Sequence, residues 1–434
     1  MPLRHLRYID LFAGMGGIRL GLVQACHDKG ITTECVFTSE IKEAAIQVYN
    51  QNHPGEPITG DITKVKAKDI PSFDVLLAGF PCQAFSYAGK GEGFADATRG
   101  TLFFDVLRIL NVKKPIGFIL ENVEGLVSHD EGRTFKTIIQ CLEKKYKVSA
   151  KVLNAKEFGV PQDRKRIYIL GVRKRYQKVD LDNFTSVHAT VGDILEQGLP
   201  LSDTQFTRNL LARYTVTQLE GKKIKDKRGG ADNIHSWDLE IKGPVSDDQK
   251  ALLNEMLKAR RQHKWAEEWK IDWMDGMPLT VQQIRKFYQH PNLQQMLNDL
   301  TAKGYVVFEH PKKKVTETKI VDGRTVTVSH REPDITKPRG YNIVAGKLSF
   351  EVSEILSRRR IAPTLVAMDM HRIHVVDGNG VRQLSLREGL RLFGYPDNFR
   401  FDVDASDGYD LLGNTVVVPV VKAVASRLLD SLNI

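Results

Sequence analysis

The feature that most constrains the fold is an alternation of short apolar runs and longer amphipathic stretches over residues 6–172. The apolar runs predict strands at Tyr8–Phe12, Glu34–Thr38, Asp74–Ala78, Ile116–Leu120 and Ile167–Val172. Helical patterns lie between them, at Ile18–His27, Ile41–Asn50, Thr101–Asn111 and Thr134–Tyr146. Because strands that alternate with helices form βαβ units, the pattern predicts an α/β, doubly wound, mostly parallel, Rossmann-like sheet. In such sheets ligands bind beyond the carboxyl ends of the strands.

The middle of the chain has a different character. Residues 201–340 hold 25 basic and 19 acidic residues, which gives +6 of the net charge of +10. Three helices are expected here, across Asp247–Asp272, Thr280–Tyr288 and Asn292–Lys303, followed by a hairpin of Val315–Val321 with Arg324–Ser329. Helices followed by a basic hairpin predict a winged-helix-like unit. Trp265, Trp269 and Trp273 are spaced four residues apart, which predicts one buried stripe of a helix.

These changes set the expected domain boundaries. Residues 1–190 form the first domain, and residues 191–345 form an inserted, mixed α/β domain. From 346 to 434 the α/β pattern returns, ends in a helix at Pro419–Leu432 and completes the first domain.

Composition restricts the partners and the compartment. The positive surplus favours a polyanionic partner. The four cysteines form no C-x-x-C pair, which predicts neither a metal site nor a disulfide framework and suits a reducing compartment. No secretory signal or apolar run of membrane-spanning length stands out. We therefore expect a soluble cytoplasmic protein without a membrane partner.

A glycine-rich segment after the first strand is typical of a nucleotide site. Gly14, Gly16 and their neighbours follow the strand and precede a helix, so the backbone can approach a ligand closely. Glu40 ends the next strand and can accept hydrogen bonds from ribose hydroxyls, while Asp61 could take an adenine amino group. Phe12 offers an aromatic face to a cationic group. Without these acids, an ordinary strand-to-helix turn would explain the glycines equally well.

One cysteine is placed for chemistry. Cys82 follows Pro81 just after the Asp74–Ala78 strand, and glycines at 89, 91, 93 and 100 predict a mobile lid behind it. The other cysteines, at 26, 35 and 141, lie in apolar or amphipathic runs typical of inert buried thiols.

Polar residues flank the same predicted sheet edge. Glu121 ends the Ile116–Leu120 strand, where its carboxyl could stay protonated or share a proton with a heterocycle nitrogen. Arg164 and Arg166 are two residues apart and would share one face of a strand. Taken alone, Glu121 could equally belong to a capping turn, and the arginines to a solvated edge.

Together, in this order, these segments resemble the DNA (cytosine-5) methyltransferase family, especially its prokaryotic restriction–modification members. The matching motifs span nearly the whole chain: DLFAGMGG (10–17), GDIT (60–63), GFPCQAFS (79–86), ENV (121–123), QDRKRIY (162–168), RIAPT (360–364), RLFGYPDNF (391–399) and GNTV (413–416). The PCQ element followed by ENV is the most specific signal. The variable block between QDRKRIY and Arg360 matches the family's target recognition domain.

The resemblance implies a function and a set of catalytic residues. Cys82 would attack C6 of a flipped cytosine in double-stranded DNA, and Glu121 would act on N3. Arg166, with Arg164, would hold the base, and Phe80 and Pro81 would contact it. The methyl donor would be S-adenosyl-L-methionine, and no metal is implied.

The cofactor-binding residues are carried over in the same way: Asp10, Phe12, Gly14, Gly16, Glu40, Ile41, Asp61, Ile62, Leu102 and Asn414. Two positions depart from the family pattern. Ile41 stands where relatives often have an aromatic residue, so adenine would be packed by aliphatic contact. Thr415 replaces the commoner serine after Asn414 and keeps the hydroxyl.

Two other functions stay open at this point. An RNA-directed enzyme of the tRNA methyltransferase type shares PCQ and ENV, but usually has Pro where this chain has Phe80, and a smaller middle block. A catalytically silent binding protein would have lost one of the chemical residues, all of which are present. We therefore expect a sequence-specific, monomeric DNA methyltransferase that protects host DNA from a separately encoded restriction endonuclease.

Overall fold

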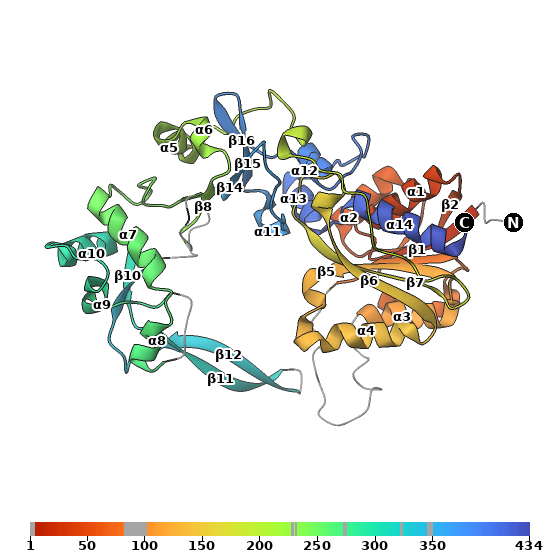
Figure 1. Ribbon diagram of the computed structural model, residues 1–434, viewed down its shortest axis with the longest axis horizontal. Coiled ribbons are helices and arrows are strands. Elements are labelled where there is room, and N and C mark those ends of the chain that lie inside the picture. Colours follow the sequence, from red (N-terminus) through yellow and green to blue (C-terminus); the bar gives the residue numbers. More distant parts are fainter. Residues whose placement is uncertain are drawn as a thin grey trace. The chain divides into compact units, whose positions relative to one another are not determined.

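The structure is a computed structural model, and it describes residues 5–81, 102–226, 230, 232–271, 276–321, 324–344 and 350–434. The chain divides into two compact units. Unit 1 comprises Met1–Gly198, Ser357–His371 and Leu384–Ile434, and unit 2 comprises Leu199–Leu356 and Arg372–Gln383. Figure 1 shows the elements of both, and each unit is described separately below.

Unit 1 is built on a seven-stranded sheet in the order β3-β2-β1-β4-β5-β7-β6. Its strands are β1 His5–Leu11, β2 Thr32–Ser39, β3 Ile58–Thr59, β4 Val75–Gly79, β5 Gly117–Val123, β6 Tyr146–Asn154 and β7 Lys165–Arg173. The strands from β3 to β5 pair in parallel, whereas β7 runs antiparallel to both β5 and β6. The predicted α/β class with a mostly parallel sheet is confirmed.

Helices cover both faces of this sheet. The helices of unit 1 are α1 Gly17–Asp28, α2 Glu43–Asn52, α3 Leu102–Lys113, α4 Arg133–Glu143, α11 Ala367–Met370, α12 Leu386–Leu392, α13 Ala405–Asn414 and α14 Val418–Leu432. Short 3-10 turns are η1 Ile62–Lys64, η2 Ala67–Asp69, η3 Glu124–Leu126, η4 His129–Gly132, η5 Ala155–Glu157 and η6 Val191–Ile194. In Figure 1, α3 and α4 lie on one face of the sheet, while α1 and α14 lie side by side on the other.

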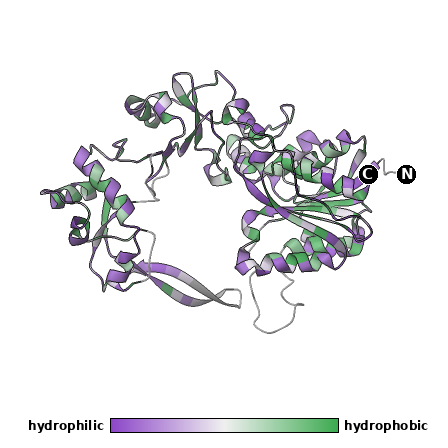
Figure 2. Cartoon of the chain, in the orientation of Figure 1, coloured by the Kyte–Doolittle hydropathy of each residue, from purple (hydrophilic) through white to green (hydrophobic). Residues whose placement is uncertain are grey.

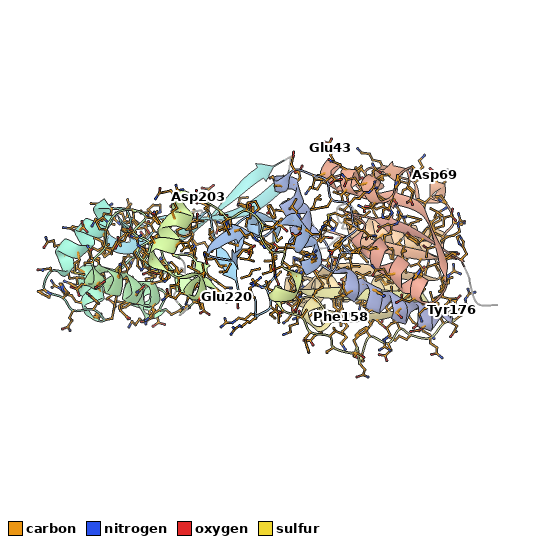
Figure 3. All side chains as sticks on the ribbon, turned by 90° about the horizontal axis from the view of Figure 1, so that it is seen from above. Glu43, Asp69, Phe158, Tyr176, Asp203 and Glu220 are labelled. Carbon is orange, nitrogen blue, oxygen red and sulfur yellow. The ribbon has the colours of Figure 1, made fainter. Side chains whose placement is uncertain are left out.

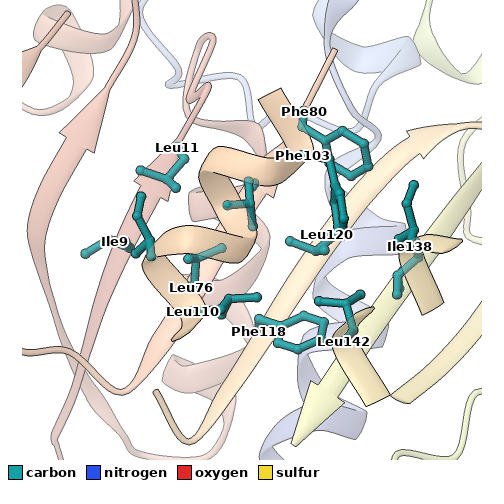
Figure 4. Close-up of a cluster of buried hydrophobic side chains, with 14 of the residues drawn as sticks. Ile9, Leu11, Leu76, Phe80, Phe103, Leu110, Phe118, Leu120, Ile138 and Leu142 are labelled. Atoms are coloured by element: carbon teal, nitrogen blue, oxygen red, sulfur yellow. The ribbon is translucent and has the colours of Figure 1, made fainter. Parts of the chain in front are cut away.

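Apolar side chains from the sheet and its helices form the core of unit 1. Figure 4 shows Phe118 and Leu120 of β5 against Leu110 of α3 and Leu142 of α4, all of them fully or almost fully buried. Burial of each such side chain stabilises the folded state by roughly 1.5–3 kcal/mol. In Figure 2 the strands of this sheet are mostly coloured as hydrophobic, as expected for strands covered on both faces.

The segment Ala405–Leu432 is apolar enough, by length and composition, to cross a membrane. In the structure it forms two helices, α13 and α14, separated by residues 415–417, and 67% of its most apolar window is buried. Because α14 packs along α1 and against β5 and β7, its apolar face belongs to the core of unit 1.

Unit 2 contains a five-stranded sheet in the order β16-β15-β14-β8-β9. Its strands are β8 Lys223–Ile224, β9 Asn233–Ile234, β14 Glu354–Leu356, β15 Ile373–Asp377 and β16 Gly380–Gln383. The helices α5 Gln205–Arg213 and α6 Val216–Leu219 contribute Leu210 and Leu219 to the same core cluster as this sheet.

The rest of unit 2 is helical with two pairs of strands. Helices α7 Asp247–Ala259, α8 Lys264–Trp269, α9 Val281–Arg285 and α10 Leu293–Ala302 surround a core that includes residues of β10 Val306–Glu309 and β13 Gly340–Ile343. Between these two strands the chain forms the predicted hairpin, β11 Lys312–Val321 with β12 Arg324–Pro333. The winged-helix-like description stays a prediction.

The prediction of one helix over Asp247–Asp272 is wrong. The helix ends at Ala259, and α8 begins at Lys264. A tertiary contact explains the break, because buried Arg260 donates a hydrogen bond to Asn342 and the Trp265 indole donates to the Ala259 carbonyl. Trp265 is buried as expected and Trp269 packs against the same core, but Trp273 lies outside the described residues.

The expected boundaries at 190/191 and 345/346 also differ from the observed units. Residues 191–198 belong to unit 1, because η6 is hydrogen-bonded to the backbone of Arg358 and Arg360. Residues 372–383 belong to unit 2 rather than to the C-terminal part of the first domain, because β15 pairs with β14 and with β16.

Candidate active site

Strands β1, β2, β4 and β5 all end at one edge of the unit 1 sheet, which we call the carboxyl edge. A cavity of about 570 Å³ lies at this edge. Thirteen residues proposed from the sequence line it: Phe12, Gly14, Glu40, Ile41, Asp61, Ile62, Phe80, Pro81, Leu102, Glu121, Arg164, Arg166 and Asn414. Asp10 and Gly16 do not line it. Cys82 and the predicted lid lie outside the described residues, since the description stops at Pro81 and resumes at Leu102.

The glycine loop takes a strained path around one end of the cavity. Gly14 and Gly16 have φ angles of +54° and +81°, and Phe12, which has a side chain, has a φ of +55°. A left-handed non-glycine residue of this kind costs about 1–3 kcal/mol and is common at ligand sites. A Cβ added at Gly14 would meet no atom of the described residues within 4 Å, so this stretch of backbone faces open space.

Glu40 ties the glycine loop to the start of α2. Its Oε2 accepts a hydrogen bond of 2.7 Å from the Gly14 backbone N–H, and its Oε1 accepts from the N–H groups of Ile41 and Lys42 at 2.8 and 2.9 Å. Each carboxylate oxygen has two lone pairs. The carboxylate is therefore fixed in place and can still accept hydrogen bonds from a ligand hydroxyl.

Asp61 and Ile41 shape the neighbouring wall. Asp61 caps η1, since its Oδ1 accepts from the Thr63 N–H and hydroxyl, and these bonds lower the pKa of the Asp61 carboxyl. Ile41 is 72% exposed, although it is a large apolar side chain. An exposed isoleucine on a cavity wall offers an apolar surface to a ligand ring.

Asp10 lies in the core of unit 1 rather than in the cavity wall. It is 1% exposed, and its Oδ2 has no hydrogen-bond partner in the described part of the chain. Burial raises the pKa of Asp10 well above its ordinary value, while Arg19 opposes this shift. Direct contact between Asp10 and a bound cofactor stays a prediction that the cavity lining does not support.

Glu121 and Arg166 form the charged pair of the site. Register explains their meeting, because the antiparallel direction of β7 places Arg166 opposite Val123, at the end of β5. The Arg166 Nε lies 3.3 Å from Glu121 Oε1, and both side chains are largely buried. Burial raises the pKa of the Glu121 carboxyl, and the guanidinium groups of Arg166 and Arg164 counteract part of that rise.

Arg164 lines the same cavity but is occupied with the backbone. Its guanidinium donates to the carbonyls of Leu365 at 2.8 Å and of Gly413 and Thr415 at 3.0 Å, and it is 2% exposed. Arg164 precedes β7 and is not within it, so the expected shared strand face with Arg166 is not formed. We find Arg164 placed to join three chain segments, and its catalytic role stays a prediction.

The end of β4 is held by the end of β5. The Asn122 side chain donates a 2.8 Å hydrogen bond to the Phe80 carbonyl, which fixes the residue two before Cys82. Phe80 is buried, with its ring 5.8 Å from that of Phe103 in α3. Pro81 is exposed and follows directly. The chain therefore leaves the sheet toward Cys82 from a rigid point next to Glu121.

Sequence reasoning gave no role to Tyr395 or Lys42. The Tyr395 hydroxyl lies 2.6 Å from the Thr415 hydroxyl, and so it holds the segment that carries Asn414. Lys42, on the cavity wall, forms an ion pair with Asp410 of α13. The adjacency of the motifs at 391–399 and 413–416 could have pointed to the Tyr395 contact.

Among the described residues, no group of three or more His, Cys, Asp or Glu side chains could hold a metal ion. The cavity thus joins an apolar, acid-rimmed half near β1 and β2 to a half with a buried carboxyl and an arginine near β4, β5 and β7. Such a division suits a site for two ligands, a nucleoside-like one and a planar polar one.

Comparison with known proteins identifies the class. A family model for C-5 cytosine-specific DNA methylases matches residues 6–430, and the chain belongs to this family. Its enzymatic class, predicted from the motifs, is therefore confirmed as DNA (cytosine-5-)-methyltransferase.

Its relatives are bacterial type II methyltransferases. M.NlaIV of Neisseria lactamica is 56% identical, with 99% of this chain and 100% of the relative covered. M.NgoBV of Neisseria gonorrhoeae is 55% identical with the same coverage. M.BanI of Aneurinibacillus aneurinilyticus is 38% identical, with 98% and 96% covered. The predicted resemblance to the restriction–modification type is thereby confirmed.

Solved structures agree with the fold. A DNA modification methyltransferase encoded within an E. coli prophage superposes with a TM-score of 0.53 at 21% identity, covering 99% of this chain and 100% of that one. The Dnmt2 methyltransferase of S. pombe gives a TM-score of 0.53 at 16% identity with the same coverage. At these identities the likeness concerns the fold alone.

Proposed function

We propose that the chain transfers a methyl group to C5 of a cytosine flipped out of duplex DNA, through a covalent bond between Cys82 and C6. The observation that carries this proposal is the Glu121–Arg166 pair, buried beside the point where the chain leaves β4 toward Cys82. A planar base inserted there would meet a carboxyl and a guanidinium, and Cys82 follows the cavity residue Pro81 directly in the sequence.

Each residue has a defined part in the chemistry. The Cys82 thiolate adds to C6, and Glu121 gives or shares a proton at N3, so that electron density reaches C5. The C5 carbon then takes the methyl group, loses its proton to a base, and the C6–S bond breaks to release Cys82. Arg166 would hold O2 of the base while it also orients Glu121. Because burial raises the pKa of the Glu121 carboxyl, this group keeps its proton to a higher pH than an exposed glutamate and can donate it to N3.

The reaction requires base flipping. A cytosine stacked in a duplex cannot reach a cavity in the protein, so it must rotate out, at a cost of a few kcal/mol. Phe80 and Pro81, both on the cavity wall, would contact the extruded base.

The methyl donor we propose is S-adenosyl-L-methionine, and the residues present fit it. Glu40 could accept hydrogen bonds from ribose hydroxyls, Ile41 and Ile62 could offer apolar contact to adenine, and Phe12, which also lines the cavity, could offer its ring to a sulfonium. When bound, this cofactor supplies an electrophilic methyl group. The open space beside Gly14 leaves room for its tail.

Unit 2 would supply sequence recognition as the target recognition domain. We further propose that the enzyme acts as a monomer in the cytoplasm and protects host DNA from a separately encoded restriction endonuclease. The 55–56% identity to two type II methyltransferases over nearly the whole chain supports that role.

The test is methyl transfer from labelled S-adenosylmethionine to duplex DNA and, in parallel, to tRNA. The proposal expects label in duplex DNA only, with bisulfite sequencing showing 5-methylcytosine within one sequence context. Label in tRNA alone would favour the RNA-directed alternative. Cofactor binding without transfer to either substrate would favour a silent binding protein.

A further inference from the structure

A second feature lies at the opposite edge of the unit 1 sheet from the cavity. Strands β4, β5 and β6 begin there, and antiparallel β7 ends there. Four segments adjoin these strand ends, residues 66–69, 111–115, 143–147 and 173–178. In Figure 3, Asp69 and Tyr176 mark this end of unit 1, and Glu43 and Phe158 lie toward the other.

Hydrogen bonds join the four segments into one surface. The Lys113 ammonium donates to the Lys68 carbonyl at 2.8 Å, and that of Lys145 to the Asn111 carbonyl at 3.4 Å. Segment 173–178 is attached to two of the others: the Arg173 guanidinium donates to the Pro115 carbonyl at 3.1 Å, and the Lys147 ammonium to the Tyr176 carbonyl at 2.8 Å. In all four bonds the acceptor is a neutral carbonyl, so the positive charge is not cancelled.

This surface, which we call the basic edge, carries eleven basic residues: Lys66, Lys68, Lys113, Lys114, Lys144, Lys145, Lys147, Arg173, Lys174, Arg175 and Lys178. The same segments hold only two acids, Asp69 and Glu143, which leaves a surplus of nine positive charges. Nine of the eleven basic residues are exposed, and Lys113 and Arg173 are partly buried.

Among the described residues, no acidic side chain neutralises the charge of the basic edge. In the part of the chain that the structure describes, none of these eleven side chains lies within 4 Å of a carboxylate oxygen. Two basic residues of the cavity differ, since Arg166 is paired with Glu121 and Lys42 with Asp410. An unpaired cluster of this density attracts a polyanion by counterion release.

The width of the basic edge indicates that the polyanion it binds is duplex nucleic acid. Four neighbouring strands span about 15 Å at about 4.8 Å each. Duplex nucleic acid offers one phosphate per about 1.7 Å of its axis, so a duplex would present about nine phosphates over that span. Along β7, Arg166 and Arg173 are about 23 Å apart at 3.3 Å per residue, so the basic edge is a surface separate from the cavity.

We propose that the basic edge binds the backbone of a second segment of duplex DNA, without regard to its sequence, while the carboxyl edge engages the first. This goes beyond the proposed function and does not require it, because phosphate binding at the basic edge involves no residue of the cavity. One chain would thereby hold two duplex segments at once.

The experiment mixes the full-length protein with two populations of a 30-base-pair duplex that carry a donor and an acceptor dye. Energy transfer reports bridging, and sedimentation confirms that one chain is present per complex. The test variant is Lys68→Gln, Lys114→Gln and Lys144→Gln combined, because these exposed side chains make no hydrogen bond or ion pair among the described residues. The matched control is Lys136→Gln, Lys270→Gln and Arg400→Gln combined, which removes the same charge from exposed side chains outside the basic edge that also make no hydrogen bond or ion pair among the described residues.

The proposal expects two duplexes per chain for the wild type and the control, and one for the test variant. Affinity for the second duplex should fall about tenfold or more in the test variant. Its dependence on salt, as the slope of log K against log salt concentration, should decrease by about 2.7, which corresponds to three lost contacts. Methyl transfer at saturating duplex should be unchanged.

Equal bridging by the wild type and the test variant would overturn the proposal. So would tighter binding of the basic edge to phosphatidylserine vesicles than to duplex, since it would identify a membrane as the partner. If the wild type transfers no methyl group, but the test variant binds one duplex fewer than the wild type, the proposed function is contradicted and the proposed DNA binding by the basic edge is supported.

Discussion

Arg164 and Arg166 lie two residues apart, yet their guanidinium groups contact different kinds of atoms. The Arg164 guanidinium donates hydrogen bonds to the carbonyls of Leu365, Gly413 and Thr415. The Arg166 guanidinium instead lies beside the Glu121 carboxyl. At the residue scale we therefore expect the first arginine to contribute mainly to stability and the second mainly to the proposed chemistry.

Two substitutions separate these contributions. Arg164→Met should lower the free energy of unfolding by roughly 3 kcal/mol, because three buried carbonyls lose a charged donor. Arg166→Lys keeps a positive charge beside the Glu121 carboxyl, so it should change the free energy of unfolding by less than about 1 kcal/mol, but it loses the planar guanidinium and should lower kcat/KM by about 100-fold. Urea denaturation and methyl-transfer kinetics measure the two effects. An equal loss of stability in both variants would contradict the assignment.

The buried Glu121 carboxyl predicts a dependence of stability on pH. Its folded-state pKa is raised, so between the ordinary value near 4.5 and the raised value the folded protein holds a proton that the unfolded chain has released. The wild type must then lose stability as pH rises through this window. Glu121→Gln has no such proton, so its stability relative to wild type should increase with pH, by at most about 1.4 kcal/mol per pH unit.

Denaturation of the wild type and Glu121→Gln from pH 4.5 to 8 checks this sign. A difference that is flat or falls with pH would show that the Glu121 pKa is not raised. The same variant should lose about 10²–10⁴-fold in methyl transfer, because glutamine cannot supply the proton at N3.

The residues of the site were predictable to different degrees. Those fixed by motif order, such as Glu40 and Glu121, line the cavity as expected. The burial of Asp10 and the backbone bonds of Arg164 were not predictable, because both depend on distant segments, such as 413–415, that fold back onto the site. Spacing within a motif shows which residues share a loop but not which donors the backbone already uses.

At the scale of elements, the direction of β7 decides the site. The sequence predicts a strand at Ile167–Val172 but not its direction, and only the antiparallel pairing brings its first residues to the carboxyl edge. β6, at Tyr146–Asn154, was not predicted, because the preceding helical pattern was extended to Tyr146 while α4 ends at Glu143. The break after α7 depends on Arg260 bonding Asn342, a contact 82 residues away in sequence.

The start of α1 packs too closely against the C-terminal part of unit 1 for any side chain at position 17. A Cβ at Gly17 would lie 2.5 Å from the Tyr395 hydroxyl and 2.7 Å from a Val416 methyl group. Gly17→Ala should therefore lower the free energy of unfolding by about 1–3 kcal/mol. It should also weaken cofactor binding, since Tyr395 and Val416 flank Thr415.

Gly125→Ala, in η3, is the control for the Gly17→Ala substitution. A Cβ there would meet no atom of the described residues within 4 Å, so the free energy of unfolding should change by less than about 0.5 kcal/mol. Thermal denaturation and calorimetric titration with S-adenosylmethionine compare the two variants. A Gly17→Ala protein as stable as Gly125→Ala would contradict the close packing of α1.

At the scale of the whole molecule, unit 2 is made of two separate stretches of chain, Leu199–Leu356 and Arg372–Gln383. β15 and β16 lie in the second stretch but complete the sheet of β14, β8 and β9. The sequence predicted an insertion here but could not show that twelve residues beyond it return to the same sheet, because strands of four or five residues carry little signal.

This division predicts the outcome of exchanging the proposed recognition unit. A chimaera that takes both stretches from a family member with a different methylated site should stay active and acquire that member's site. A chimaera that exchanges 191–345 alone should fold poorly, because it separates β14, β15 and β16 from β8 and β9. Bisulfite sequencing of host DNA reads the outcome, and unchanged specificity in the two-stretch chimaera would place recognition outside unit 2.

The central claim is that Cys82 bonds transiently to a cytosine, and 5-fluorocytosine tests it most directly. Fluorine at C5 cannot leave as the proton does, so methyl transfer should trap the protein on the duplex. With the fluorinated base at the methylated position, the account predicts a denaturation-resistant adduct for the wild type and for Cys141→Ser, and none for Cys82→Ser. No adduct from the wild type, or one that persists in Cys82→Ser, would contradict it.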